Sequence, residues 1–311
     1  MSFSDTKQFS GKQVSQWQMG KPLADPSLAI KLAIDPYNDD PAFPDYFAEF
    51  IKQPGLDKID TLIIGSWGEA YEEDSSVAVN LLVQNNGLFP NLTSLFIGDL
   101  AMEEAEVSWI QQSDVSPIYA AFPKLETLQL RGGEGLSLGN LSHDRLQSLI
   151  IESGGLGKDV LEQSRLAQLP ELTHLELWLG DENYGCDIGQ DDLRAFLSHL
   201  SDQFPKLHYL GLRNYYLSDD LAAVIASVGA PKNIDTLDLS LGNLSDKGAE
   251  ALLTSDKLSH LRILDLHHHY LSNDMMAKVT ASDLAANINL ADQEEGDEYD
   301  GEIERYIFVA E

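Results

Sequence analysis

One pattern of apolar positions recurs along the chain: an apolar residue, two others, a leucine, one other, and then leucine or isoleucine. It occurs eight times, at Ile59/Leu62/Ile64, Leu92/Leu95/Ile97, Leu125/Leu128/Leu130, Leu146/Leu149/Ile151, Leu172/Leu175/Leu177, Leu207/Leu210/Leu212, Ile234/Leu237/Leu239 and Leu261/Leu264/Leu266. Successive first positions lie 33, 33, 21, 26, 35, 27 and 27 residues apart. Because alternate side chains of an extended segment share a face, each copy predicts a short strand with one buried face. Eight copies predict stacked repeats that bury a continuous core.

The segments between these strings carry a helical pattern. Residues 217–228 and 244–255 place apolar side chains three and four positions apart, which predicts a helix in each. Ser218 and Ser245 precede the apolar positions and are the expected N-caps. Parallel strands that alternate with helices indicate an α/β protein.

The two ends depart from the repeat. Residues 1–55 contain a strand-like run at 28–35 and an aromatic helical stretch at 43–52, which together predict an N-terminal cap. Residues 56–290 form the predicted solenoid of about eight repeats, and Ile288 and Leu290 indicate a last short strand. Residues 291–311 are an acidic tail, within which 306–310 could fold back as a closing strand.

Residues 56–290 resemble the leucine-rich-repeat superfamily. The similarity rests on the eight strings followed by leucine and a helix, as in LDLSLGNLSDKGAEALL, and it is greatest with the ribonuclease-inhibitor-like branch. That resemblance implies a right-handed solenoid curved into a horseshoe, with a parallel concave sheet and helices or irregular segments on the convex side. The phrases GSWGEAYEEDSS, RGGEGLSL, HLELWLG and LDLHHHYLSNDMM are also similar to a narrower family of bacterial cytoplasmic proteins, which implies no particular activity.

The ninth repeat position departs from the superfamily, where an asparagine bonds neighbouring loop backbones. Here the position holds Trp67, Leu100, Gly133, Gly154, Gly180, Tyr215, Gly242 and His269. Since glycine permits close approach of backbones, we expect backbone bonds or water to replace the asparagine ladder. The loops after the strands should then deviate from the regular curve.

The concave face is the first candidate binding surface. Its fifth column reads Ile63, Phe96, Gln129, Ile150, Glu176, Gly211, Asp238 and Asp265, and its seventh reads Gly65, Gly98, Arg131, Glu152, Trp178, Arg213, Ser240 and His267. Tryptophan and arginine are enriched at interface hot spots, so Arg131, Trp178 and Arg213 are the expected anchors, beside Glu152, Asp238 and His267. The alternative is an ion pair between Arg131 and Glu152, with Trp178 covered by a loop.

Two long loops after the first two strands add aromatic residues among carboxylates. Trp67, Tyr71 and Trp109 lie near Glu69, Glu103, Glu104 and Glu106 in the sequence. Such a mixture suits a basic peptide or a cationic ligand through cation–π contacts and charge-assisted hydrogen bonds. The competing interpretation is that Trp109 and Ile110 fill the core beneath an enlarged repeat.

Charge and cysteine content narrow the partners. The chain has 51 acidic and 20 basic residues, a net charge of −31, which disfavours nucleic acid and anionic membranes. The acidity could serve solubility alone or attract a basic partner. No apolar run has the length of a signal peptide's core or a membrane span, and Cys186 is the single cysteine, expected as a buried filler. We therefore expect a cytoplasmic protein.

Catalytic motifs are weak. His267, His268 and His269 could bind a metal with Asp238 or Asp265, although a loop with one core-facing histidine is the simpler expectation. Residues 131–139 lack the spacing of a phosphate loop. The sequence thus predicts a non-catalytic scaffold for a protein or peptide, with no cofactor. The alternative is an enzyme or enzyme accessory with a small-molecule or metal site near Glu69, Glu134 and Glu152.

Overall fold

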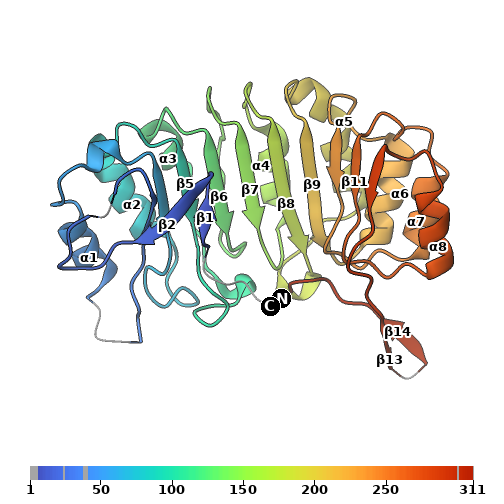
Figure 1. The fold of residues 1–311 in the computed structure, drawn as a ribbon, viewed down its shortest axis with the longest axis horizontal. Coiled ribbons are helices and arrows are strands. Elements are labelled where there is room, and N and C mark those ends of the chain that lie inside the picture. Colours follow the sequence, from blue (N-terminus) through green and yellow to red (C-terminus); the bar gives the residue numbers. More distant parts are fainter. Residues whose placement is uncertain (1–5, 24, 38–40, 300, 311) are drawn as a thin grey trace. The chain divides into compact units, whose positions relative to one another are not determined.

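The computed structural model describes residues 6–23, 25–37, 41–299 and 301–310 of the 311-residue chain. It is an α/β protein in which strands and helices alternate along the sequence (Figure 1). The chain divides into two compact units. Unit one runs to Glu152 and includes Ala167–Glu171, whereas unit two comprises Ser153–Leu166 and the chain from Leu172 onward.

Unit one contains a mainly parallel sheet whose strands follow in sequence order. Its strands are β1 (Gln8–Phe9), β2 (Lys12–Gln16), β3 (Ala29–Leu32), β4 (Thr61–Ile64), β5 (Ser94–Ile97), β6 (Thr127–Arg131) and β7 (Ser148–Glu152). The β1–β2 pair is antiparallel, and the pairs from β2–β3 to β6–β7 are parallel. Leu62, Leu95 and Leu128 lie side by side in the parallel register, so equivalent repeat positions form rows. The helices are α1 (Phe43–Phe50), α2 (Ser76–Gln84) and α3 (Pro117–Ala121), with short 3-10 turns at Leu56–Lys58, Asn86–Leu88 and Val107–Trp109.

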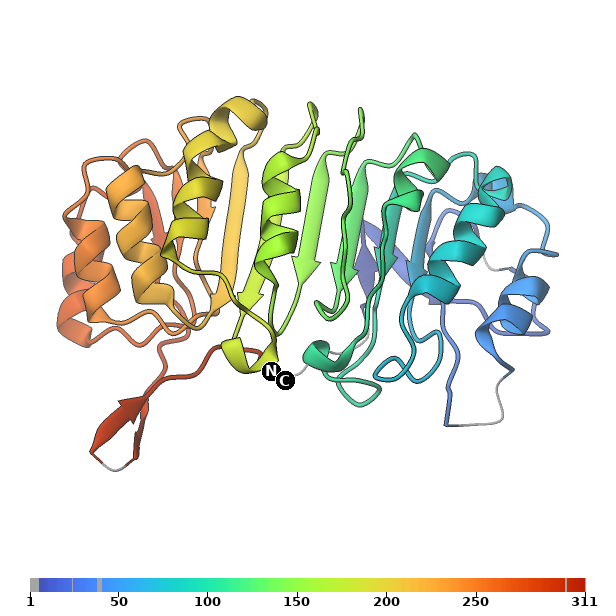
Figure 2. The ribbon, with the colours of Figure 1, turned by 180° about the vertical axis from the view of Figure 1, so that it is seen from behind.

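Unit two repeats the arrangement with longer helices. Its parallel strands are β8 (His174–Gly180), β9 (Tyr209–Tyr215), β10 (Thr236–Asp238), β11 (Ile263–Asp265) and β12 (Asn287–Asn289). The helices are α4 (Lys158–Leu166), α5 (Gln190–Gln203), α6 (Ser218–Val228), α7 (Asp246–Leu253) and α8 (Asn273–Thr280), with a 3-10 turn at Glu182–Tyr184. In each unit the helices cover one face of the sheet (Figure 2). The opposite face is here called the strand face.

The strands predicted from the apolar pattern are confirmed. Each of the eight strings contributes to one strand from β4 to β11, and its leucines and isoleucines are buried. The predicted last strand around Ile288 is β12, and the run at 28–35 contains β3. Since β2 pairs in parallel with β3, and β3 in parallel with β4, the N-terminal segment extends the sheet of unit one. The aromatic side chains of α1 are buried in the core, as expected.

Two local predictions are wrong. Ser245 caps α7 by accepting from the Lys247 amide, but Ser218 lies inside α6 and donates to the Tyr215 carbonyl instead. Residues 306–310 fold back onto unit two without forming a strand. The Val309 amide donates to the Asn214 side chain at 3.0 Å, and the Phe308 amide donates to the Leu241 carbonyl at 2.8 Å. A separate hairpin, β13 (Asp297–Tyr299) and β14 (Glu302–Glu304), precedes this segment.

None of the helices in the described part of the chain has the length and apolar character needed to cross a bilayer.

Candidate functional site

Three ladder positions hold large side chains that bond to backbone groups. The indole N–H of Trp67 donates to the Glu73 carbonyl at 2.9 Å, and the Tyr215 hydroxyl donates to the Ile188 carbonyl at 2.6 Å. The buried ring of His269 lies between backbone groups of Leu290 and Leu271, each 3.2 Å from a ring nitrogen. At these positions a side chain replaces the asparagine, where we expected backbone bonds or water.

The burial of Trp67 also corrects its predicted role. Its side chain is only 1% exposed, and its N–H is already bonded within the loop. Trp67 therefore fills the repeat beneath the loop and offers no surface to a partner.

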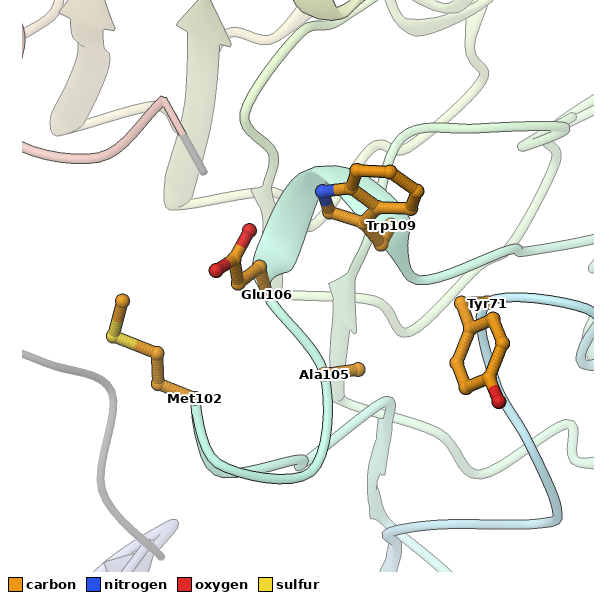
Figure 3. A pocket seen from close by; sticks show the side chains of 5 residues that line it. All are labelled: Tyr71, Met102, Ala105, Glu106 and Trp109. Carbon is orange, nitrogen blue, oxygen red and sulfur yellow. The ribbon is translucent and has the colours of Figure 1, made fainter.

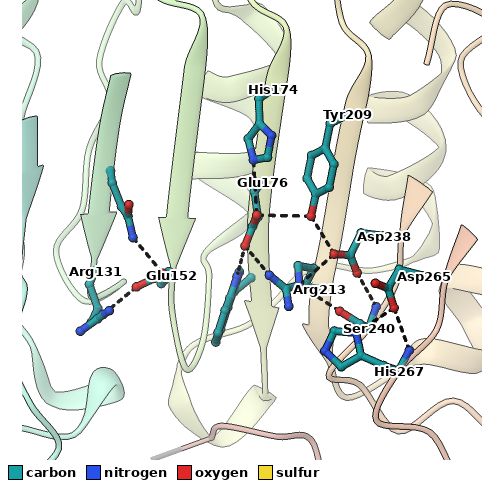
Figure 4. A network of polar contacts seen from close by, with 12 residues as sticks. Arg131, Glu152, His174, Glu176, Tyr209, Arg213, Asp238, Ser240, Asp265 and His267 are labelled. Atoms are coloured by element: carbon teal, nitrogen blue, oxygen red, sulfur yellow. Dashed lines mark hydrogen bonds and ion pairs between the residues drawn. The ribbon is translucent and has the colours of Figure 1, made fainter. Parts of the chain in front are cut away.

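On the strand face of unit one, Arg131 is part of a buried charge network. Its Nε lies 2.6 Å from Glu152 Oε2 (Figure 4). Its Nη1 lies 3.0 Å from the Leu100 carbonyl and 3.5 Å from Asp99. Lys31 Nζ lies 3.0 Å from the second Asp99 oxygen. The alternative that paired Arg131 with Glu152 is confirmed, and the expectation of an exposed Arg131 is wrong.

The apolar part of the same face is covered. Ile63 and Phe96 of the fifth column have no exposed surface, because Phe9 of β1 packs on them with its ring centroid 5.7 Å from that of Phe96. Arg131 also lies over the Phe96 ring, with its guanidinium carbon 5.1 Å from the ring centroid. This part of the predicted binding face is therefore interior.

The strand face of unit two carries a second network, centred on Glu176. Its Oε1 accepts from the Trp178 indole and from Arg213 Nη1, each at 2.7 Å, while Arg213 Nε lies 3.3 Å from Asp238 (Figure 4). The Arg213 guanidinium also stacks over Trp178, 5.2 Å from the ring centroid. Trp178 is buried, so the prediction that it is an exposed anchor is wrong. The network does bring together Trp178, Arg213 and Asp238.

Glu176 stays ionised because of its partners. Burial alone would raise its pKa, but hydrogen bonding by His174 and Trp178 and the charge of Arg213 lower the pKa to about 2. The His174 and Tyr209 rings stack with centroids 4.0 Å apart, and the Tyr209 hydroxyl donates to Asp238 at 2.7 Å. The cluster is a largely buried charge network in which Arg213 is held between two carboxylates.

The three consecutive histidines have different environments. His267 Nδ1 lies 2.7 Å from Asp265, a contact that raises the pKa of the histidine. His268 contacts the Gly242 carbonyl at 3.1 Å, and His269 faces the core as described above. Among the described residues, no three or more metal-ligating side chains of His, Cys, Asp or Glu converge on one point.

A cluster of exposed aromatic and apolar side chains lies on the loops that follow β4 and β5. Trp109 is 57% exposed and Met102 is 42% exposed, and with Tyr71, Ala105 and Glu106 they line a hollow of about 350 Å³ (Figure 3). The Tyr71 hydroxyl donates to Glu69 at 2.8 Å, which fixes the ring at the rim. The competing interpretation, that Trp109 and Ile110 fill the core, is wrong for Trp109 and confirmed for Ile110, which is buried together with Val107.

The three carboxylates of the alternative small-molecule or metal site have different surroundings. Glu134 is exposed, Glu152 is held by Arg131 and Gln129, and Glu69 accepts from Tyr71.

Burial raises the pKa of the Cys186 thiol to about 12, so the thiolate is absent at neutral pH.

Several important residues escaped the sequence reasoning: Lys31, Asp99, Met102, Tyr209 and Asn214. Lys31 precedes the eight strings, so the column argument did not include it. The sequence did contain one signal for Lys31, the glycine at position 65 in the seventh column. A Cβ on Gly65 would lie 2.7 Å from Lys31 Cε, so the glycine leaves room for the lysine side chain to pass.

Comparison with known proteins relates the chain to a solved structure. No protein-family model matches the chain, and no curated protein does. Among solved structures, a Bacteroides fragilis protein determined by the Northeast Structural Genomics Consortium is 34% identical, with a TM-score of 0.72. The match covers 78% of this chain and 69% of that one. The chain therefore belongs to the same family as this Bacteroides fragilis protein.

Proposed function

We propose that the protein is a non-catalytic binding scaffold that holds a basic segment of a partner protein in the hollow formed by Tyr71, Met102, Ala105, Glu106 and Trp109. The observation that carries the proposal is the exposure of Trp109 and Met102 beside carboxylates. Large apolar side chains that stay exposed in one cluster mark interaction sites.

The chemistry of the hollow suits a lysine or arginine side chain. The aliphatic stem of such a residue can lie on Met102, while its charged end lies over the Trp109 indole and beside Glu106. Tyr71 is already oriented by Glu69, which lowers the entropy lost when a ligand binds. The net charge of −31 attracts a basic partner from a distance and accelerates its association.

The strand face is a weaker candidate than we expected from the sequence. Arg131 and Arg213 are already paired with carboxylates, and Trp178 is covered and bonded to Glu176. A partner that used these side chains as anchors would first have to break buried charge-assisted bonds, each costing roughly 1.5–3 kcal/mol. We therefore place the binding site on the loops.

The finer classification as a ribonuclease-inhibitor-like leucine-rich-repeat solenoid belongs to the same proposal. It is supported by the eight strings, by their parallel in-register strands and by the helix that follows each of β8 to β11. Repeat proteins of this kind commonly bind partners through extended surfaces and inserted loops.

The test is a titration of the full chain with a fluorescein-labelled peptide of alternating arginine and alanine. We expect Trp109→Ala to weaken binding about 5- to 30-fold, the range of a cation–π contact of about 1–2 kcal/mol. Glu106→Gln should weaken binding at low salt more than at high salt. The matched control is Leu166→Ala, which removes an exposed apolar side chain from α4. Equal affinity of Trp109→Ala, Glu106→Gln and the wild type would refute the proposed site.

A further inference from the structure

The hairpin β13–β14 carries two large apolar side chains that are mostly exposed. Tyr299 is 72% exposed and Ile303 is 63% exposed. The two strands pair with each other and project from the body of unit two (Figure 1). An isolated two-stranded hairpin is at best marginally stable in water, so its persistence here needs an explanation.

Both ends of the hairpin are fastened to unit two. Before it, the Glu294 amide donates to the His269 carbonyl at 2.8 Å, and the Gln293 side chain donates to the Leu271 carbonyl at 2.8 Å. After it, the Tyr306 amide donates to the Tyr270 hydroxyl at 3.0 Å. The hairpin is thus held at a fixed place while its two strands remain uncovered.

The acidic residues of the hairpin indicate which kind of partner could bind it. Of residues 297–304, five are acidic and none is basic. Because Asp297 pairs with Glu304, and Glu298 pairs with Ile303, carboxylates occupy both faces. Alternation places Tyr299 on the face of Asp297, and Ile303 shares the other face with Glu298. Each face therefore combines one exposed apolar side chain with carboxylates.

We propose that the hairpin is a docking arm that takes a basic, extended segment of a partner protein as a third strand. An exposed strand edge offers unpaired N–H and C=O groups, and an added strand satisfies them. Lysine or arginine on that strand meets the carboxylates, while its apolar residues pack on Tyr299 and Ile303. This site is in unit two and does not depend on the hollow around Trp109.

A second copy of the chain is the wrong occupant for this edge. Pairing two such hairpins would set acidic residues against acidic residues, and like charges directly opposite each other destabilise a sheet. The docking arm therefore favours a basic segment over the hairpin of a second copy of the chain.

The experiment measures hydrogen exchange of the full chain with a peptide of alternating lysine and valine, and with a glutamate–valine peptide as control. We expect the lysine peptide to slow amide exchange within residues 297–304 and the glutamate peptide to leave it unchanged. Exchange slowed only within residues 66–110 would overturn the docking arm and leave the proposed hollow standing. A dimer that disappears when the hairpin is altered would also overturn it.

Two matched variants test the charge pattern. The first variant combines Asp297→Asn, Glu298→Gln and Glu304→Gln. It should bind the lysine–valine peptide at least tenfold more weakly than the wild type at low salt. The control removes three other exposed charges from unit two, at Asp202, Asp256 and Asp283, each replaced by asparagine. Equal weakening by both variants would mean that overall charge alone attracts the peptide, and would overturn the proposal. Tyr299→Ala with Ile303→Ala should weaken binding at high salt as well.

Discussion

The Tyr209 ring lies against Gly211, in the space that a side chain on Gly211 would occupy. A Cβ at Gly211 would lie 3.1 Å from Tyr209 Cε1 and 3.2 Å from its hydroxyl oxygen. Since the glycine leaves this space free, the Tyr209 hydroxyl donates to Asp238 on β10 at 2.7 Å and lies 3.3 Å from Glu176 on β8. One glycine thus lets the middle strand join the two carboxylates on either side of it.

Gly211→Ala should destabilise unit two by about 1–3 kcal/mol, the usual cost of forcing a methyl group into a packed site. The added Cβ pushes Tyr209 away and leaves Asp238 without its hydroxyl donor. Chemical denaturation, followed by a probe in unit two, measures the change. Gly157→Ala is the control, because a Cβ there has no neighbour within 4 Å. Equal stability of the two variants would contradict the account of Tyr209.

Arg131→Met should lower the free energy of unfolding of unit one by about 3–5 kcal/mol, because it leaves Glu152 buried without its cation. Combining it with Glu152→Gln should restore part of the loss, since the unpaired charge is then gone. Glu49→Gln breaks an exposed ion pair with Lys52 and should change stability by less than about 0.5 kcal/mol. A loss from Arg131→Met as small as that from Glu49→Gln would rule out the buried network as a stabilising element.

Glu176 should make unit two sensitive to acid. Its folded pKa of about 2 lies below the ordinary value of 4.5, so its contribution is present above pH 4.5 and is lost as the pH falls towards 2. Glu176→Gln removes this contribution. The stability difference between wild type and Glu176→Gln should therefore be largest near pH 6 and shrink towards pH 2.5. Unfolding free energies measured across this range would instead differ by a constant if the Glu176 pKa were unperturbed.

His269 should tolerate asparagine better than alanine. His269→Ala leaves the Leu290 carbonyl and the Leu271 amide without their ring partners, at a cost of roughly 1–3 kcal/mol for each buried group that stays unpaired. Asparagine offers both a donor and an acceptor, as it does in the superfamily's ladder. Thermal unfolding of the two variants compares them, and an equal loss would show that only the ring's volume matters.

The strands were predictable because their signal is local and periodic. Leucines two positions apart, as at Leu128 and Leu130, determine which face of a short strand is buried, whatever surrounds it. The same reasoning failed for the outward columns, because period two assigns Arg131 and Trp178 to a face but does not reveal what covers that face. Arg131 instead contacts residues about 30 positions earlier, Asp99 and Leu100, and Asp99 in turn pairs with Lys31, which is further away still.

The loops were predictable in composition and not in conformation. Trp67 and Trp109 occur in similar acidic surroundings, yet one is buried and the other is exposed. The two differ in their position within the repeat. Trp67 occupies the ladder position after β4, where the side chain points inward, whereas Trp109 lies on the long loop after β5, beyond that repeat's ladder position. The ladder position therefore distinguishes the buried tryptophan from the exposed one.

The contact between Asn214 and Val309 also constrains the order in which unit two can assemble during synthesis. The two residues are 95 positions apart, and the Asn214 amide group bonds both the N–H and the C=O of Val309. At about 5–20 residues per second, the partner of Asn214 is made some 5–20 s after Asn214 itself. The nascent chain must therefore keep this asparagine solvated until its partner leaves the ribosome, and unit two becomes complete only after release of that segment.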